Sequence, residues 1–288
     1  MIVRTRFAPS PTGYMHLGHA FAAQVAHNLA RQSPEGSFLL RHEDLDTPRV
    51  REPFYQKIED DLQWLGLLWD EPPLRQSTRT AAYQSALAVL QENGLIYPCF
   101  CTRRDIQNES ANIASAPHAP QSSTYPGTCR LLSPQQQHDQ IAAGTSHAWR
   151  LDSHRAFSHT GPLTFHDLRF GSTPVNPDLL GDVILARKDI GCSYHLAVVV
   201  DDAFQHITHV TRGDDLLPST HVHRLLQALL ALPEPVYLHH PLVRDTHGKR
   251  LAKRYDALAI TTLRQAGLTP AEALARSQPT PPCPHGDV

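Results

Sequence analysis

The sequence predicts an α/β fold with a parallel sheet that has helices on both faces. Two strand–loop–helix units open the chain, over residues 2–31 and 37–66, and polar residues follow the strand of each unit. The run HLAVVVDD at 195–202 is the third observation, because a continuous β-branched run is typical of a strand buried on both faces. Ligands of such sheets bind beyond the carboxyl ends of the strands. Polar residues at these ends are therefore the first candidates for a functional site.

Composition excludes several classes of protein. The 288 residues are 41% hydrophobic, which is too apolar for a disordered chain. No apolar run approaches the roughly 20 residues of a membrane span, and the N-terminal MIVRTRF has no signal core. The five cysteines, an odd number, do not form a disulfide framework, so we expect a cytoplasmic protein with no membrane contact. A net charge of −2 excludes a broad basic surface for nucleic acid but allows a local basic groove.

The first half of the sheet domain is assigned to residues 1–95. Its predicted elements are two strands and three helices, at 2–8, 37–41, 17–31, 53–66 and 78–94. The last of these helices ends at Asn93-Gly94, a helix-stop signal. The strand at 37–41 leads into an acidic stretch that contains Glu43, and we expect this stretch at the edge of the sheet.

The rest of the chain divides into four parts. An inserted module is expected at 96–180, where 107–128 is a Ser-, Ala- and Pro-rich loop and weak alternation at 146–170 predicts strands. The second half of the sheet domain, with strands at 183–187 and 195–202 and a helix near 219–232, is assigned to 181–240. A basic loop and a short helical segment follow at 241–275. The Pro-rich end, 276–288, is expected to be a disordered tail.

The segment RFAPSPTG, followed by HLGH at 16–19, carries the first chemical signal. A strand ends here, turns through prolines and enters a helix whose N-terminus favours anions. His16 and His19 can donate hydrogen bonds to phosphate oxygens, and Gly18 leaves room for a flat base. The alternative is that two of the 19 histidines simply cap a helix.

Three cysteines form the second signal. Cys99, Cys101 and Cys129 have the spacing of metal ligands, but structural zinc prefers four. Tyr125 and His118 are both candidates for the fourth ligand, and histidine is the commoner one. The alternative is a set of three free thiols beside a loop.

The run RFAPSPTGYMHLGHA resembles the first active-site signature of class I aminoacyl-tRNA synthetases, in the glutamyl/glutaminyl branch. Further segments resemble that branch in the same order, namely RHEDLD at 41–46, WLGLLWDE at 64–71, YHLAVVVDD at 194–202 and HVTRGDDL at 209–216. RLAKR at 250–254 takes the place of the second signature, KMSKS. It retains Lys253 and its positive charge, but alanine stands where the signature has its first serine, so a hydroxyl donor is lost there.

The resemblance implies a Rossmann-like catalytic domain and a site for each substrate. The implied residues for L-glutamate are Arg6, Phe7, Ala8, Pro9, Ser10, Glu43, Tyr194 and Arg212. Those implied for ATP, with Mg²⁺ on its phosphates, are His16, Gly18, His19, Arg250 and Lys253. Of these, His16, His19 and Lys253 have the catalytic role of stabilising charge on the triphosphate. The resemblance also implies one structural Zn²⁺ on Cys99, Cys101, Tyr125 and Cys129.

The length narrows the implied function. Full-length glutamyl-tRNA synthetases carry a further region that reads the anticodon, and this chain ends soon after RLAKR. The resemblance is therefore to short paralogues that activate glutamate with ATP, without tRNA, and attach it to the queuosine of tRNA(Asp). We expect a monomeric ligase of this kind. A truncated glutamyl-tRNA synthetase that charges an acceptor end is one alternative, and a non-catalytic RNA-binding paralogue is another.

Overall fold

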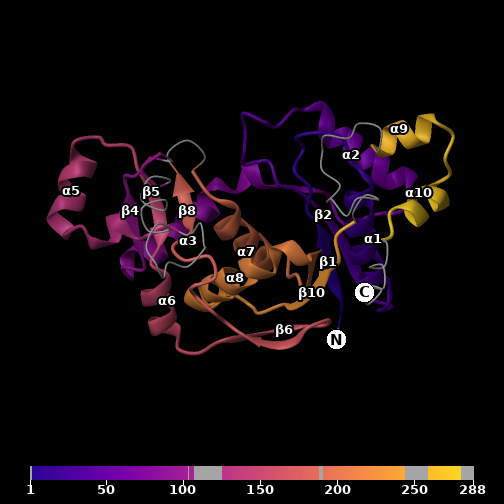
Figure 1. Ribbon diagram of the computed structural model, residues 1–288. Helices are drawn as coiled ribbons and strands as arrows, with labels where there is room; N and C mark the ends of the chain where they lie inside the picture. The colour runs from indigo at the N-terminus through magenta and orange to yellow at the C-terminus, as the bar shows by residue number, and fades with distance from the viewer. Residues whose placement is uncertain (1, 103, 107–124, 188–190, 244–258, 280–288) are drawn as a thin grey trace, which may run out of the picture.

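Three groups of strands organise the molecule (Figure 1). The computed structural model describes residues 2–102, 104–106, 125–187, 191–243 and 259–279. Two of the groups are mainly parallel and lie next to each other, and the third is antiparallel and lies toward the end of the molecule that holds α5 (Pro134–Ala142).

The first parallel group has the order β1 (Arg4–Phe7), β2 (Ser37–His42), β3 (Leu74–Arg75). Helix α1 (Leu17–Arg31) packs on β1 through a row of alanines, and the Thr5 hydroxyl donates to the Ala26 carbonyl at 2.8 Å. Alanine side chains allow this close approach because they hold a helix and a strand apart less than larger ones do. The same apolar core contains Phe38 and, from α2 (Pro53–Trp64), Leu62, both fully buried.

The second group has the order β7 (Gly171–Pro174), β6 (Thr164–Asp167), β10 (Val236–His240), β9 (His209–Gly213), of which β6, β10 and β9 are parallel. β7 is antiparallel to β6. The Thr208 N–H, just before β9, donates to the Arg4 carbonyl of β1 at 3.0 Å. The amino ends of β1 and β9 therefore lie together, and nearer their carboxyl ends Arg6 Nη1 reaches the Thr211 carbonyl at 3.0 Å. Helix α8 (Leu217–Leu229) follows β9.

The third group is the antiparallel sheet β4 (Ile96–Cys99), β5 (Ala148–Leu151), β8 (Ile184–Arg187). Helix α3 (Thr80–Glu92) leads into it, and Gly94 turns the chain there with a φ of 63°, which glycine adopts without strain. The short helix η1 (Gln76–Arg79) precedes α3, and η2 (Thr128–Leu131) packs against β4. A third short helix, η3 (Asp214–Leu216), joins β9 to α8 in the second group.

The prediction of a buried strand at 195–202 is wrong. The segment belongs to helix α7 (Tyr194–Phe204), which packs against α3, α8 and β8 (Figure 1). A helix covered on several sides is apolar around most of its circumference, and its sequence then reads like that of a buried strand. Packing between two helices outweighs the β-propensity of the valine run.

The prediction of strands throughout 146–170 is only partly right. β5 and β6 are strands, but α6 (Ser153–Thr160) lies between them. Asp152 caps this helix, since its carboxylate accepts a hydrogen bond from the Arg155 N–H at 3.0 Å. An Asp before a short helix is a recognisable helix start. The alternation of polar and apolar residues does not reveal it and predicts a strand there instead.

The remaining predicted elements are confirmed within a few residues: β1, α1, β2, α2, α3, β8 and α8. At the C-terminal side the structure has α9 (Ile260–Gln265) and α10 (Pro270–Arg276). The loop at 107–128 falls largely, and the end of the chain mostly, outside the described residues. The domain boundaries stay a prediction. In the part of the chain that the structure describes, no helix is both long and apolar enough to cross a membrane.

Candidate active site

A cavity of about 400 Å³ opens where β1, β9 and α7 meet, and we call it the first cavity. It is lined by Arg6, Phe7, Ala8, Ala22, Glu43, Tyr194, Thr211, Arg212, Gly213 and Leu216. Six residues expected to bind glutamate lie together on its wall. The carboxyl ends of two parallel strands supply Arg6 and Arg212, as expected for a site in a sheet of this class.

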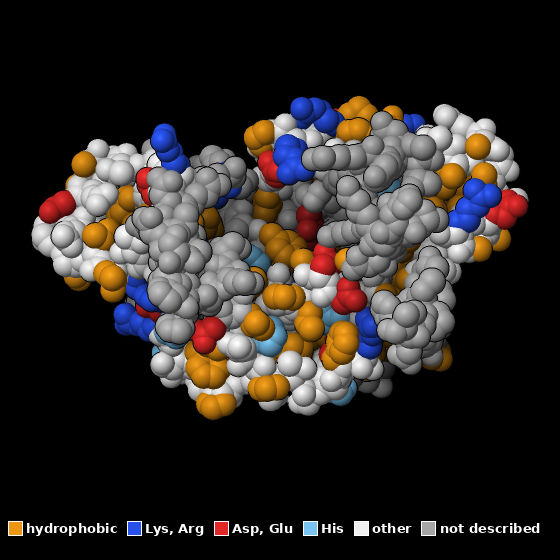
Figure 2. All heavy atoms as spheres, viewed as in Figure 1, with side chains coloured by type: hydrophobic (Ala, Val, Ile, Leu, Met, Phe, Trp, Pro, Cys, Tyr) orange, Lys and Arg blue, Asp and Glu red, His pale blue; other side chains and the backbone are white. Residues whose placement is uncertain are grey.

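A second cavity of about 740 Å³ adjoins the first, because Glu43 and Tyr194 line both. Ser10, a further predicted glutamate residue, borders this second cavity. Pro9 lines neither of the two, but its carbonyl accepts the Glu43 N–H at 3.0 Å and so holds the acidic segment against the end of β1. Figure 2 shows the molecule hollowed near its centre, between the part that holds α5 and the part that holds α1.

Asp202 of α7 holds two arginine side chains next to the first cavity. Its carboxylate accepts from Arg6 Nε at 2.8 Å and from Arg41 Nη1 at 2.8 Å. Arg6 Nη1 also donates to the Thr211 carbonyl at 3.0 Å. Burial acts to raise the pKa of Asp202, but the two guanidinium groups outweigh it and hold the pKa below its usual range. The carboxylate is therefore ionised, and Arg6 is held by the protein on several sides.

Glu43 lies beside this cluster and faces both cavities. Its carboxylate is 3.6 Å from Arg41 Nη2. Burial raises the pKa of Glu43, and the charges of Arg41 and Arg6 oppose the rise. A cation that entered the first cavity beside Glu43 would favour its ionised form.

Arg212 is the second arginine of the cavity wall. It is 7% exposed, and its Nη1 donates to Nδ1 of His223 on α8 at 2.8 Å. Its Nε is buried without a hydrogen-bond partner. Arg212 lines the first cavity, and a guanidinium group is suited to pair with a carboxylate there.

The HLGH segment begins α1, and its first histidine caps the helix, while the role of the segment in binding phosphate stays a prediction. His16 is the N-cap: its Nδ1 accepts from the Gly18 N–H at 3.1 Å, and His19 Nδ1 accepts from the His16 N–H at 3.3 Å. The two rings stack with centroids 3.9 Å apart. A Cβ on Gly18 would lie 3.0 Å from the His16 ring, so the glycine makes room for the stacked pair. Each neutral imidazole carries its proton on Nε2, the nitrogen that can donate to an anion.

His16, Gly18 and His19 line neither of the two cavities described above. Arg250 and Lys253 of the RLAKR segment lie outside the described residues. The described chain resumes at Ala259, which forms a β-bridge with His16, and the Ile260 N–H donates to the Met15 carbonyl at 2.8 Å. The chain that follows RLAKR is thus attached beside HLGH.

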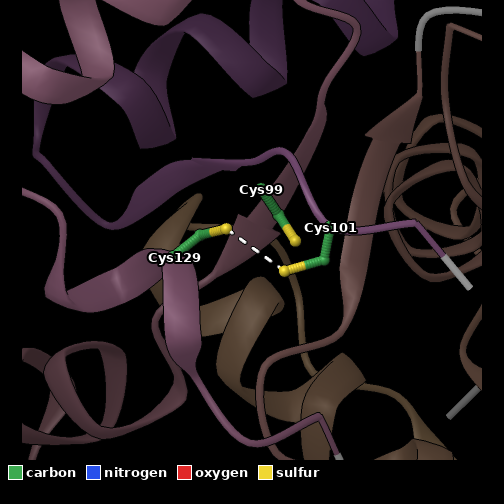
Figure 3. A group of neighbouring side chains, drawn as sticks. All are labelled: Cys99, Cys101 and Cys129. Atoms are coloured by element: carbon green, nitrogen blue, oxygen red, sulfur yellow. Dashed lines mark hydrogen bonds between the residues drawn. The ribbon is translucent and has the colours of Figure 1, made fainter. Parts of the chain in front are cut away.

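The three cysteines converge at the end of β4 and in η2. Their sulfur atoms lie within 4.8 Å of one another, with 3.4 Å between Cys101 and Cys129 (Figure 3). Zinc–sulfur bonds of about 2.3 Å in a tetrahedron place sulfurs about 3.8 Å apart, so this arrangement fits a zinc ion. The Tyr125 hydroxyl is 3.6 Å from Cys101 Sγ, and its oxygen accepts from the Cys129 N–H at 2.9 Å. Tyr125 therefore stands with the cysteines, while His118 lies outside the described residues.

The comparison with known proteins decides the family. The sequence matches the family described as tRNA synthetases class I (E and Q), catalytic domain, over residues 2–276. The chain belongs to this family.

Relatives within the family differ in length. The chain is 48% identical to a glutamyl-Q tRNA(Asp) synthetase of Rhodobacter capsulatus over 93% of this chain and 97% of the relative. It is 37% identical to a glutamate–tRNA ligase of Aquifex aeolicus, of which it covers 55%. A crystal structure of a glutamate tRNA ligase from Elizabethkingia meningosepticum, in complex with its amino acid, has a TM-score of 0.71 at 29% identity, over 88% of this chain and 52% of that one. The chain thus spans about half the length of the glutamate–tRNA ligases it matches.

Sequence reasoning missed the residues beneath this synthetase site. The sequence places Asp202 at the end of an apolar run but does not show that it pairs with Arg6. A carboxylate that directly follows such a run is a signal for a buried ion pair. His223 gave no signal at all, because a histidine within a predicted helix is ordinary in a chain with 19 of them. Their roles depend on contacts between distant segments, such as Arg6 with Asp202, which local patterns do not encode.

Proposed function

We propose that this chain activates L-glutamate with ATP, without tRNA, and transfers the glutamyl group to the queuosine base in the anticodon of tRNA(Asp). Two relatives at 48% and 45% identity support this proposal, because they are named glutamyl-Q tRNA(Asp) synthetases and this chain covers 97% and 82% of their lengths. Such a protein is a ligase that forms an ester bond to tRNA.

The charge of the first cavity carries the assignment of glutamate. Arg6, Arg41 and Arg212 lie at or beneath it, together with Glu43 and Asp202. With both carboxylates ionised, three positive and two negative charges leave a net charge of +1. Glutamate, with two carboxylates and one ammonium, carries −1, whereas the glutamine zwitterion is neutral. Charge complementarity therefore favours glutamate.

Two charged groups of glutamate have a partner of suitable chemistry in this proposal. Arg212 takes the side-chain carboxylate, since it lines the first cavity and a guanidinium group pairs well with a carboxylate. Glu43 faces the α-ammonium, and Tyr194 closes the wall between the two cavities. Arg6, Phe7, Ala8, Pro9 and Ser10 form the strand end along which the substrate lies. Arg6 contributes its charge while Asp202 fixes its orientation.

ATP is assigned to the start of α1. His16, Gly18 and His19 supply donors and space at a helix N-terminus, and Arg250 and Lys253 belong to the segment that leads to Ala259 beside His16. An oxygen of the glutamate α-carboxylate attacks the α-phosphorus, the bond to the β-phosphate oxygen breaks, and pyrophosphate leaves. His16, His19 and Lys253 stabilise the charge on the leaving group. Mg²⁺, when bound to the phosphates, supplies further charge neutralisation.

The second step is an acyl transfer. A hydroxyl of the queuosine cyclopentene-diol attacks the acyl carbon of glutamyl-adenylate, loses its proton, and displaces AMP to leave an ester. The second cavity adjoins the first at Glu43 and Tyr194, which supports the entry of the nucleoside there.

The strand order supports a Rossmann-like sheet, since β3, β2, β1, β9, β10 and β6 follow one another when β1 is placed beside β9. The cysteine cluster supports a structural zinc site on Cys99, Cys101, Tyr125 and Cys129 within an inserted module. We also propose that the protein works as a monomer in the cytoplasm.

Two measurements test the proposed function. Glutamate-dependent exchange between ATP and pyrophosphate is expected without tRNA, and its absence in folded, zinc-loaded protein would indicate a non-catalytic RNA-binding paralogue. Mass analysis of digested tRNA is expected to show glutamate on a queuosine nucleoside. Glutamate on the 3′-terminal adenosine would instead identify a truncated glutamyl-tRNA synthetase.

A further inference from the structure

A chain of three buried or half-buried side chains leads away from the first cavity. Arg212 Nη1 lies 2.8 Å from His223 Nδ1, and His223 Nε2 lies 3.1 Å from His195 Nδ1. The three residues come from β9, α8 and α7, so the chain joins three separate elements. His223 is 1% exposed and Arg212 is 7% exposed, and water is therefore excluded from the contact between them.

The chemistry of the three groups fixes the direction of every hydrogen bond. A guanidinium has donors only, so Arg212 donates and His223 Nδ1 accepts. The proton of neutral His223 is then on Nε2, from which it is donated to His195 Nδ1. Burial and the charge of Arg212 lower the pKa of His223 well below its usual value, which keeps the ring neutral.

The surroundings leave Arg212 few other orientations. Its guanidinium lies over the Tyr237 ring, with the central carbon 5.2 Å from the ring centroid, and Tyr194 packs edge-on against His223 at 5.5 Å. Tyr194 and Arg212 both line the first cavity. An arginine without such neighbours has several rotamers. The hydrogen bond from Arg212 Nη1 to His223 restricts these rotamers before a ligand binds.

We propose that His223 is a positioning residue that holds the Arg212 guanidinium in the orientation needed to bind the side-chain carboxylate of glutamate, with His195 fixing the His223 ring. The inference rests on the proposed function and extends it to two residues outside the cavity wall. It predicts that His223 governs affinity for glutamate and not affinity for ATP.

Three variants separate positioning from a general role in folding. His223→Leu removes the acceptor for Arg212, while His223→Asn restores an acceptor at about the place of Nδ1. His221→Leu is the matched control, because His221 is a buried histidine on the same helix whose Nδ1 accepts the Asn176 N–H at 2.9 Å, away from Arg212. Each variant is assayed as the full chain by pyrophosphate exchange, with glutamate and ATP varied separately, and by calorimetric titration with glutamate alone.

We expect His223→Leu to raise the glutamate KM and Kd by about tenfold or more and to change the ATP KM by less than about twofold, since a charge-assisted hydrogen bond is lost. His223→Asn should recover most of the loss, and His221→Leu should leave both KM values unchanged. A glutamate Kd for His223→Leu within about twofold of wild type, or an equal loss in His223→Asn, would overturn the proposal. So would an equal rise in His221→Leu. Absence of exchange in the wild type would count against the proposed function instead.

Discussion

The first cavity and the cysteine cluster both concentrate reactive side chains, but they satisfy them differently. In the cavity, Asp202 holds two arginines, and Arg212 still has a buried N–H without a partner. In the cluster, the polar groups bond one another. Cys129 Sγ accepts the Phe100 N–H at 3.3 Å, and the Tyr125 hydroxyl contacts Cys101 Sγ and accepts from the Cys129 N–H. The cavity thus keeps a guanidinium that the protein does not fully satisfy, whereas the polar groups of the cluster bond one another.

The two regions are also held in place by different residues. Asp182 joins η2, which carries Cys129, to the antiparallel sheet. Its carboxylate accepts hydrogen bonds from Tyr97 of β4 at 2.6 Å, from Ser153 of α6 at 2.8 Å and from Arg130 of η2 at 3.0 Å. None of these donors lines either cavity. Changes in one region should therefore leave the readout of the other intact, and the following experiments test this separation.

The largest effect is expected from Asp202→Asn. The change leaves Arg6 and Arg41 buried without a full counter-charge, so the free energy of unfolding should fall by about 3 kcal/mol or more. Urea unfolding measures it. The control is Asp70→Asn, since the Asp70–Arg31 pair is more than a third exposed on both sides and should cost about 1 kcal/mol or less. Equal losses in the two variants would contradict the role of Asp202.

Arg212→Lys should be next in size. Lysine keeps the charge but cannot bond His223 and a carboxylate with a planar fork, so kcat/KM for glutamate should fall about 100-fold. Pyrophosphate exchange gives this number. Zinc content should match the wild type, and a loss of zinc here would break the separation between the two regions.

Cys101→Ser should reverse that pattern. Bound zinc should drop from about one ion per chain to nearly none, as measured by metal analysis of purified protein, because a thiolate ligand is lost. The glutamate KM should stay within about twofold of wild type. Cys192→Ser is the control for zinc content, since Cys192 lies outside the cluster. Normal zinc content in Cys101→Ser would exclude the site.

The smallest effect is expected from Tyr125→Phe, which removes one hydroxyl next to Cys101. Zinc affinity, measured by competition with a chelator, should weaken about tenfold, as when a group that supports a metal site is lost. His118→Ala should leave it unchanged. The opposite result would make His118 the fourth ligand.

Much of the fold could be predicted because most of its helices and strands begin or end at residues that are recognisable in the local sequence. Pro9 and Pro11 end the first strand, and Asn93-Gly94 ends α3. The segment at 195–202 could not be predicted in this way, because a helix packed on several sides carries no polar face to mark its period. The candidate site came mainly from motifs. Six of the eight predicted glutamate residues line one cavity, but Asp202 and His223 become visible only when distant segments meet.

The end of α7 shows how strictly this fold controls spacing. Asp201 accepts from Gln76, Arg79 and Tyr83, whereas its neighbour Asp202 accepts from Arg6 and Arg41. Successive residues of an α-helix point about 100° apart, so the two aspartates face different neighbours by rotation alone. One residue inserted between Tyr194 and Asp201 would turn both carboxylates away from their arginines while the composition of the helix hardly changed. The two charge clusters at its end therefore fix the length of this helix as well as its sequence.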